Sequence, residues 1–102
     1  MKEITVQTLK ELIQANKAPH LIDVREPHEH DEFNLGGQNI PVTELPFRIA
    51  ELKSIGEEDI ILYCQSGSRS SLAQKLLEAQ FNITNTTNVL GGVKAWKAAF
   101  ED

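Results

Sequence analysis

The residue of this chain best suited to covalent chemistry is Cys64, its only cysteine. The thiolate is the nucleophilic form of cysteine, and its pKa falls when backbone N–H groups, a helix N-terminus or a cation lie close to the sulfur. The residues that follow can supply all three; they are Gln65, Ser66, Gly67, Ser68, Arg69 and Ser70. We therefore interpret Cys64 as a nucleophile.

The segment from Cys64 to Ser70 predicts an anion-binding loop. Small residues between a strand and a helix allow successive N–H groups to point inward. A helix that begins near Ser70 would add the positive end of its dipole. Gly67 tolerates a positive φ where the loop must curl, and Arg69 adds a charge that persists at neutral pH. Such a loop would stabilise a thiolate or the terminal sulfur of a persulfide.

A single cysteine can also be an inert member of a hydrophobic core. The polar neighbours of Cys64 argue against this alternative, because Gln65, Ser66 and Ser68 would gain nothing from a dry interior. Cys64 also directly follows residues 60–63, a continuous apolar run that is typical of a buried central strand. Its place at the end of such a strand favours chemistry over packing.

The elements that must position this loop alternate β-rich runs with helical patterns. The expected strands cover residues 3–6, 20–24, 39–41, 60–63 and 86–89. Helices are predicted from Thr8, with Glu11 completing a capping box, from Pro27, around Leu45, Ile49 and Leu52, from about Ser70 to Ala79, and around Val93, Trp96 and Phe100. Within the helix at 70–79 we expect Leu72, Leu76 and Leu77 to face inward.

This alternation predicts a single α/β domain over residues 1–102. The expected architecture is a central parallel sheet of about four to five strands with helices on both faces. Ligands of such sheets bind beyond the carboxyl ends of the strands. Because Cys64 lies at the carboxyl end of the most apolar strand, we expect the site there.

Length and charge exclude several function classes. A chain of 102 residues has room for one domain. Its net charge of -5 argues against nucleic acid as a partner, and no apolar run approaches the roughly 20 residues that span a membrane. One cysteine cannot form an internal disulfide, which fits a reducing compartment. We expect a cytoplasmic protein with no membrane partner.

Four motifs together resemble the rhodanese family. They are Cys64-x-x-Gly67-x-Arg69-Ser70 in the loop, Asp23-Val24-Arg25 at the end of an expected strand, Asn39-Ile40-Pro41, and Gly91-Gly92-x-x-x-Trp96 near the end of the chain. The similarity runs from about Ile4 to Trp96 and covers nearly the whole chain. The occurrence of all four in this order makes the resemblance much more specific than any one motif.

The resemblance implies a sulfurtransferase of the thiosulfate sulfurtransferase type. Its thiolate, Cys64, would take a sulfane sulfur from a donor such as thiosulfate, hold it as a persulfide, and pass it to a thiol, cyanide or a protein acceptor. Residues 65–70 would line the active site, with Arg69 acting on the anionic donor. Asp23 and Arg25 would support the pocket wall as an ion pair. No cofactor, metal or general base is implied.

Three other features have a structural interpretation. Asn34 stands where the family commonly has a histidine, in a segment shorter by about one residue; we interpret it as a structural turn variant, and an effect on substrate contacts stays open. Residues 28–32 place His28 and His30 among acidic residues. We interpret this cluster as a solvated surface turn rather than a metal site. Trp96 is interpreted as a core residue.

Two other functions are possible on the same fold. Related phosphatases and arsenate reductases typically show Cys-x5-Arg, a loop that can hold a tetrahedral oxyanion. This chain has Cys-x4-Arg between Cys64 and Arg69, and the tighter loop suits a single sulfur better. The other alternative is a sulfur relay or interaction module that receives sulfur from a protein donor. The physiological donor, the acceptor and the oligomeric state stay open.

Overall fold

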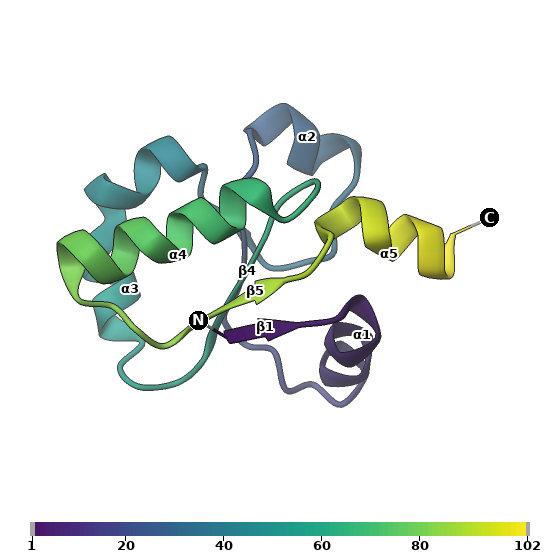
Figure 1. Cartoon of the computed structure of the whole chain (residues 1–102), viewed down its shortest axis with the longest axis horizontal. Helices are drawn as coiled ribbons and strands as arrows, with labels where there is room; N and C mark the ends of the chain where they lie inside the picture. Colours follow the sequence, from purple (N-terminus) through teal and green to yellow (C-terminus); the bar gives the residue numbers. More distant parts are fainter. Residues whose placement is uncertain (1, 102) are drawn as a thin grey trace.

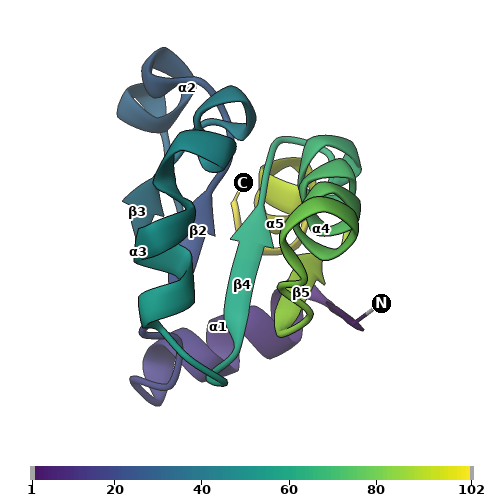
Figure 2. The same cartoon turned by 90° about the vertical axis from the view of Figure 1, so that its left-hand side faces the viewer.

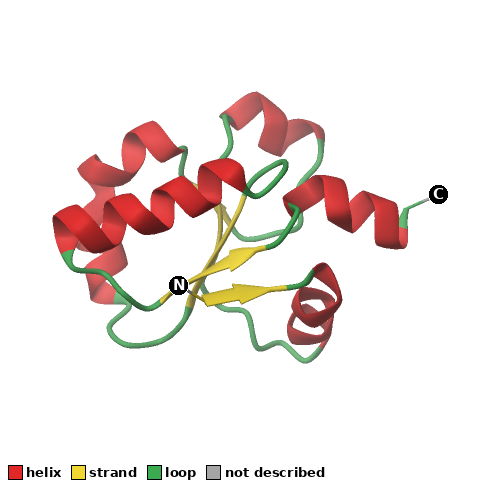
Figure 3. Cartoon of the chain, viewed as in Figure 1, coloured by secondary structure: helices red, strands yellow, loops and turns green. Residues whose placement is uncertain are grey.

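The computed structural model describes residues 2–101, which form a five-stranded parallel sheet (Figure 1, Figure 3). In spatial order the strands are β1 (Lys2–Ile4), β5 (Thr86–Val89), β4 (Ile60–Tyr63), β2 (Leu21–Asp23) and β3 (Gln38–Asn39). The helices are α1 (Val6–Gln14), α2 (Pro27–Glu32), a 3₁₀ helix η1 (Val42–Arg48), α3 (Ile49–Ser54), α4 (Ser68–Phe81) and α5 (Gly92–Phe100). The predicted α/β class and parallel sheet are confirmed.

Two hydrophobic clusters cover the two faces of the sheet. Alternate residues of β4 serve both: Ile60 and Leu62 pack with η1, α3 and α4, whereas Ile61 and Tyr63 pack with α1 and α5. Figure 1 and Figure 2 show the same division of the helices around the strands. All four residues of β4 are buried, as expected for a central strand covered on both sides. Within residues 2–101 no helix combines the length and apolar character needed to cross a membrane.

The N-terminal helix begins earlier than predicted. Its cap is Thr5, whose side-chain oxygen accepts the N–H of Thr8 at 3.1 Å, so the predicted cap at Thr8 is wrong. A threonine oxygen can satisfy one of the free N–H groups of the first turn from either position. The start at Val6 buries Val6 and Leu9, and it shortens the preceding strand to Lys2–Ile4.

The helix after the cysteine also differs in its start and its inward face. α4 begins at Ser68, two residues before the predicted start, and ends at Phe81. Leu72 is 61% exposed, so its predicted inward position is wrong. Leu77 is buried as predicted. The path of the chain out of β4 turns Ser70 and Ala73 inward beside it.

The start of α5 holds the loop between β4 and α4 from outside. The N–H groups of Val93 and Lys94 donate to the carbonyl oxygens of Cys64 and Gln65, each at 2.9 Å. A Cβ atom on Gly92 would lie 2.2 Å from the carbonyl oxygen of Cys64. Gly92 is therefore required for the close approach that these two hydrogen bonds need.

An ion pair ties α2 to the first turn of α4. The two terminal guanidinium nitrogens of Arg69 donate to the carboxylate of Glu29, at 2.7 and 2.9 Å. The hydrogen bond from Arg69 is the main reason that the pKa of Glu29 falls to about 2. Glu29 also accepts the N–H of Glu26 and completes a capping box at the start of α2. The pair thus fixes α2 against the loop.

We predict that Gly92→Ala destabilises the protein beyond the strain of a positive φ. Gly56 offers a matched control: its φ is +76° against +56° at Gly92, but no atom lies within 4 Å of the place that its Cβ would take. Gly56→Ala should cost about 1 kcal/mol, and Gly92→Ala about 2 kcal/mol more because of overpacking against Cys64. Urea denaturation measures both. Equal losses would contradict the close packing of α5 on the loop.

We predict that Glu29→Gln flattens the acid limb of the stability profile. The folded-state pKa of about 2 lies below the ordinary value of 4.5, so the stabilisation is complete above pH 4.5 and is lost as the pH falls towards 2. Arg69 is 39% exposed, and we therefore expect a loss of about 1 kcal/mol at neutral pH.

The measurement is the free energy of unfolding of wild type and variant between pH 7 and pH 2. The difference should be largest at neutral pH and should shrink towards pH 2. Glu51→Gln is the control, because it removes an ion pair with Arg48 that is more exposed and lies away from the loop. Parallel profiles for wild type and Glu29→Gln would show that the Arg69 pair does not stabilise the fold.

Candidate active site

The sulfur of Cys64 lies at the carboxyl end of β4 and is the point on which the following loop converges. Cys64 is fully buried. Its Sγ accepts the backbone N–H of Gly67 at 3.1 Å, the N–H of Ser70 at 3.4 Å and the hydroxyl of Ser70 at 3.4 Å. The structure therefore brings together the thiol, the middle of the predicted loop at Gly67 and its last residue, Ser70.

These contacts change the ionisation of the thiol. Burial raises the pKa of Cys64, but the Ser70 hydroxyl and the backbone N–H groups of Ser70, Ser66 and Gly67 lower it by more. The net direction is downward from the ordinary value. Hydrogen bonds to a charged form favour that form, so this arrangement can hold a sulfur anion without a neighbouring base.

Gly67 gives the loop its curl. Its φ is +97°, and a Cβ atom there would lie 3.2 Å from the backbone nitrogen of Gly91. Glycine adopts this conformation without the cost that a side chain would bring. The hydroxyls of Ser66 and Ser68 lie 3.2 Å apart on the exposed side of the loop. Their side chains thus face solvent, while the Ser66 backbone contributes to the sulfur site.

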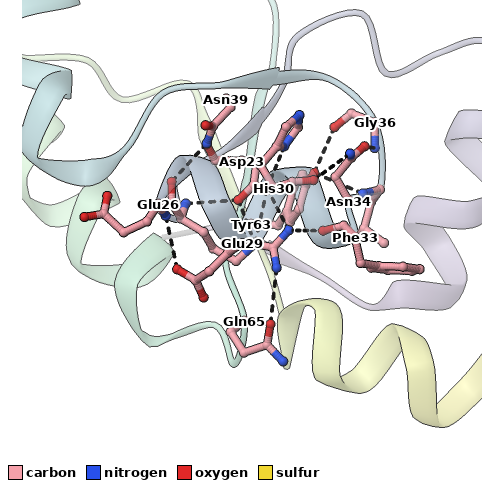
Figure 4. Close-up of polar contacts among 12 residues, drawn as sticks. Asp23, Glu26, Glu29, His30, Phe33, Asn34, Gly36, Asn39, Tyr63 and Gln65 are labelled. Atoms are coloured by element: carbon pink, nitrogen blue, oxygen red, sulfur yellow. Dashed lines mark hydrogen bonds and ion pairs between the residues drawn. The ribbon is translucent and has the colours of Figure 1, made fainter.

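A buried ion pair supports one wall of the site (Figure 4). The Asp23 carboxylate accepts the Arg25 side chain at 2.8 to 3.2 Å and contacts Nδ1 of His30 at 2.9 Å. Burial alone would lower the pKa of Arg25, but the hydrogen bond and the charge of Asp23 outweigh burial, so the pKa of Arg25 is raised. Arg25 then donates to the side-chain oxygen of Gln65 at 3.3 Å. This chain of contacts connects β2 to the loop.

The sequence predicts that the charge of Arg69 helps to stabilise the sulfur anion, but the structure pairs Arg69 with a carboxylate of α2. Its guanidinium is engaged by Glu29, and hydrogen bonds within the loop are the main causes of the lowered Cys64 pKa. A small cavity of about 170 Å³ lies beside Arg69 and is lined by Val24, Glu26, Val42 and Thr43. Arg69 is thus partly neutralised at the rim of the site.

The interpretation of residues 28–32 as a solvated turn is wrong in part. Residues Pro27–Glu32 form a helix, and both Glu29 and His30 point to the site, where they contact Arg69 and Asp23. Acidic residues and histidines alternate along this short helix, so the sequence does not indicate which of them lie on its inner face. Among residues 2–101, no group of three or more potential ligand side chains is placed to hold a metal ion.

Asn34 is committed to the turn that follows α2 (Figure 4). Its side-chain oxygen accepts the N–H of Gly36 at 2.8 Å, and its nitrogen donates to the carbonyl of His30 at 2.9 Å. The Tyr63 hydroxyl holds the same turn by donating to the carbonyl of Gly36 at 2.9 Å. Both polar atoms of the Asn34 side chain are thereby used within the turn, which supports its structural interpretation.

Trp96 packs against the core as the sequence predicts, whereas the sequence does not indicate that Asn88 lies at the site. Trp96 is half-buried against the α1 and α5 cluster and stacks edge-on with Phe100 at 4.8 Å. Asn88 is a buried member of β5 whose side chain contacts Gly67 and Ser70. Its only sequence signal is an amide within an otherwise strand-forming run, which does not reveal the partner.

Comparison with known proteins agrees with this geometry. The family model for the rhodanese-like domain matches residues 5–99. YtwF of Bacillus subtilis, named as a sulfurtransferase, is 35% identical over 98 residues, which cover 95% of this chain and 91% of YtwF. YrkF of the same species, named as a sulfur carrier protein, is 28% identical over 100 residues; these are 97% of this chain but 52% of YrkF, so the chain spans about half of that relative.

A solved structure shows the same fold. The rhodanese-like domain protein from Staphylococcus aureus superimposes with a TM-score of 0.77 at 32% identity, covering 94% of this chain and 91% of that one. The residues matched by the family model include the loop after β4 and the strands on both sides of it. With the Cys64 loop, the buried Asp23–Arg25 pair and the parallel sheet in place, the chain belongs to the rhodanese-like domain family and is a rhodanese-like sulfurtransferase homologue.

Proposed function

We propose that this protein moves a sulfane sulfur through a persulfide on Cys64. The observation that carries the proposal is the convergence of loop N–H groups and the Ser70 hydroxyl on one buried sulfur. Donors preorganised around a developing anion stabilise it without reorganisation. The backbone N–H groups of the loop serve the thiolate before the reaction and the persulfide after it.

The proposed cycle has two balanced steps. In the first, the Cys64 thiolate attacks the outer sulfur of thiosulfate, a new S–S bond forms, and the old S–S bond breaks with its electron pair leaving on sulfite. The negative charge now lies on the terminal sulfur of the persulfide. In the second, a nucleophile such as cyanide or a thiolate attacks that sulfur, and the electron pair returns to Cys64. Neither step needs a proton, a metal or a cofactor.

The donor and acceptor are proposed from chemistry. An anionic donor such as thiosulfate would meet Arg69 at the rim, where Glu29 offsets part of its charge. A thiol or a protein acceptor suits a sulfur held in the loop at the carboxyl end of β4, and the sulfur-carrier name of YrkF agrees with a relay between proteins. A single cysteine with no disulfide partner fits a reducing compartment such as the cytoplasm.

The observed rim favours sulfur over phosphate. Four residues separate Cys64 from Arg69, and the guanidinium turns to the Glu29 carboxylate rather than into the loop. Bidentate binding of a phosphate would need that guanidinium to be available. We therefore expect the protein to lack hydrolytic activity on an aryl phosphate.

We predict that incubation with thiosulfate adds one sulfur, about 32 Da, to the intact protein through a covalent intermediate on Cys64. Cyanide should then remove the adduct and yield thiocyanate. Intact mass spectrometry measures the first event and a colour assay for thiocyanate the second. Cys64→Ser should show neither, because the nucleophile is absent, while its circular dichroism spectrum should match that of the wild type.

The control reactions use the same protein with a persulfide donor and with an aryl phosphate. A wild-type protein that gains no sulfur from thiosulfate or from the persulfide donor would overturn the proposed function. Turnover of the aryl phosphate that depends on Cys64 would instead favour the phosphatase alternative. If the protein gains sulfur from the persulfide donor but not from thiosulfate, the proposed persulfide on Cys64 stands and thiosulfate is excluded as the donor.

A further inference from the structure

The side chain of Asn88 lies behind the sulfur site, on the strand next to the one that ends at Cys64. Asn88 is paired in register with Leu62 across β5 and β4, and it is 3% exposed. Its side-chain nitrogen donates to the carbonyl oxygen of Gly67 at 3.3 Å, and its side-chain oxygen makes a short contact with the hydroxyl of Ser70. Asn88 therefore contacts Gly67 and Ser70, two of the residues that donate to the sulfur.

The contact with Gly67 determines how the Asn88 amide is oriented. If the amide were turned over, its oxygen would face the Gly67 carbonyl, and two acceptors would meet without a proton between them. The side-chain oxygen of Asn88 must therefore face Ser70. Because an amide oxygen carries no hydrogen, the Ser70 hydroxyl has to supply the proton of that contact.

The Ser70 hydroxyl has more acceptors than it can satisfy. Its oxygen lies 3.4 Å from the Cys64 sulfur, 3.2 Å from the Gly67 carbonyl oxygen and in short contact with the Asn88 amide oxygen. A hydroxyl donates one hydrogen bond. Because Ser70 is fully buried, bulk water does not reach it to donate a hydrogen bond to the remaining acceptors. The sulfur and the amide must compete for a single proton.

We propose that Asn88 is a positioning residue that competes with the Cys64 sulfur for the Ser70 proton, an inference that rests on the proposed function for its role in the cycle. While the sulfur is a thiolate, the hydroxyl turns towards it. When the charge moves to the terminal sulfur of the persulfide, the hydroxyl turns back to Asn88. The hydroxyl thus donates a hydrogen bond in both states, to the sulfur in the first and to the amide oxygen in the second, and the amide limits how strongly the thiolate is stabilised.

Other charged groups near the sulfur do not replace this contact. Arg69 on α4 is paired with Glu29 on α2, and the Asp23–Arg25 pair of β2 is joined by His30. Lys94 on α5 donates its backbone N–H to Gln65 and has an exposed side chain. The side-chain hydrogen bonds of Asn88 are with Ser70 and Gly67 and not with these groups, so a change at Asn88 removes none of their contacts. A change in Cys64 ionisation in an Asn88 variant can therefore be assigned to Ser70 or to the loop backbone.

The test is a double-mutant cycle on Asn88 and Ser70. Asn88→Leu removes the acceptor at similar volume, and Ser70→Ala removes the hydroxyl. The pH dependence of Cys64 alkylation by iodoacetamide, followed by intact mass, gives the ionisation midpoint in wild type, both single variants and the double variant. We expect Ser70→Ala to raise the midpoint and Asn88→Leu to lower it, each by about half a pH unit.

The decisive result is the double variant. With Ser70→Ala present, Asn88→Leu should no longer lower the midpoint, since no hydroxyl remains to be released. If Asn88 were only a brace for the loop, its loss would loosen the N–H groups of Gly67 and Ser70 and raise the midpoint in both backgrounds. Either that rise or an equal shift in both backgrounds would overturn the inference.

The design keeps this inference separate from the proposed function. The midpoints are measured on the unloaded protein without any sulfur donor, so they can be read even if thiosulfate adds no sulfur. Asn88→Ala, assayed in the same cycle, serves if Asn88→Leu does not give a native circular dichroism spectrum. It removes the same acceptor, so it should also lower the midpoint when Ser70 is present and leave it unchanged in the Ser70→Ala background.

Discussion

The hydrogen bonds onto the buried sulfur of Cys64 are the constraint on which the rest of this site depends. A thiolate with 0% exposure would be strongly disfavoured by burial, and the loop reverses that effect with N–H donors from Gly67 and Ser70. Each neighbouring element then serves this geometry. β4 delivers the sulfur, α4 begins at once behind it, and α5 holds the loop carbonyls so that the N–H groups face inward.

The parallel sheet brings separate parts of the sequence to this one edge. β2 ends at the Asp23–Arg25 pair, which reaches the loop through Gln65. α2 contributes Glu29 and His30 to the same wall, and β5 contributes Asn88 from behind. The charges of the wall are paired with one another, so the donors that reach the sulfur are neutral dipoles. In the proposed cycle, such a site would hold the negative charge on Cys64 and then on the terminal sulfur of the persulfide without a net change in its own protonation.

Sequence patterns were sufficient for the sheet, the loop and the place of Cys64, because continuous apolar runs and a Gly/Ser-rich strand-to-helix segment are local signals. They were insufficient for contacts between distant segments. The pairing of Arg69 with Glu29 and the position of Asn88 depend on tertiary packing. The inward face of α4 was wrong for Leu72, since the path out of β4, not local hydrophobicity, determines which residues turn towards the sheet.

We infer that the loop stabilises a sulfur anion on Cys64. The absolute ionisation midpoint of that thiol in the wild-type protein, measured from the rate of alkylation between pH 5 and pH 10, tests this stabilisation without any variant. We expect a midpoint below the free-thiol value of about 8.5. A midpoint at or above about 8.5 would contradict it, since burial would then outweigh the loop donors.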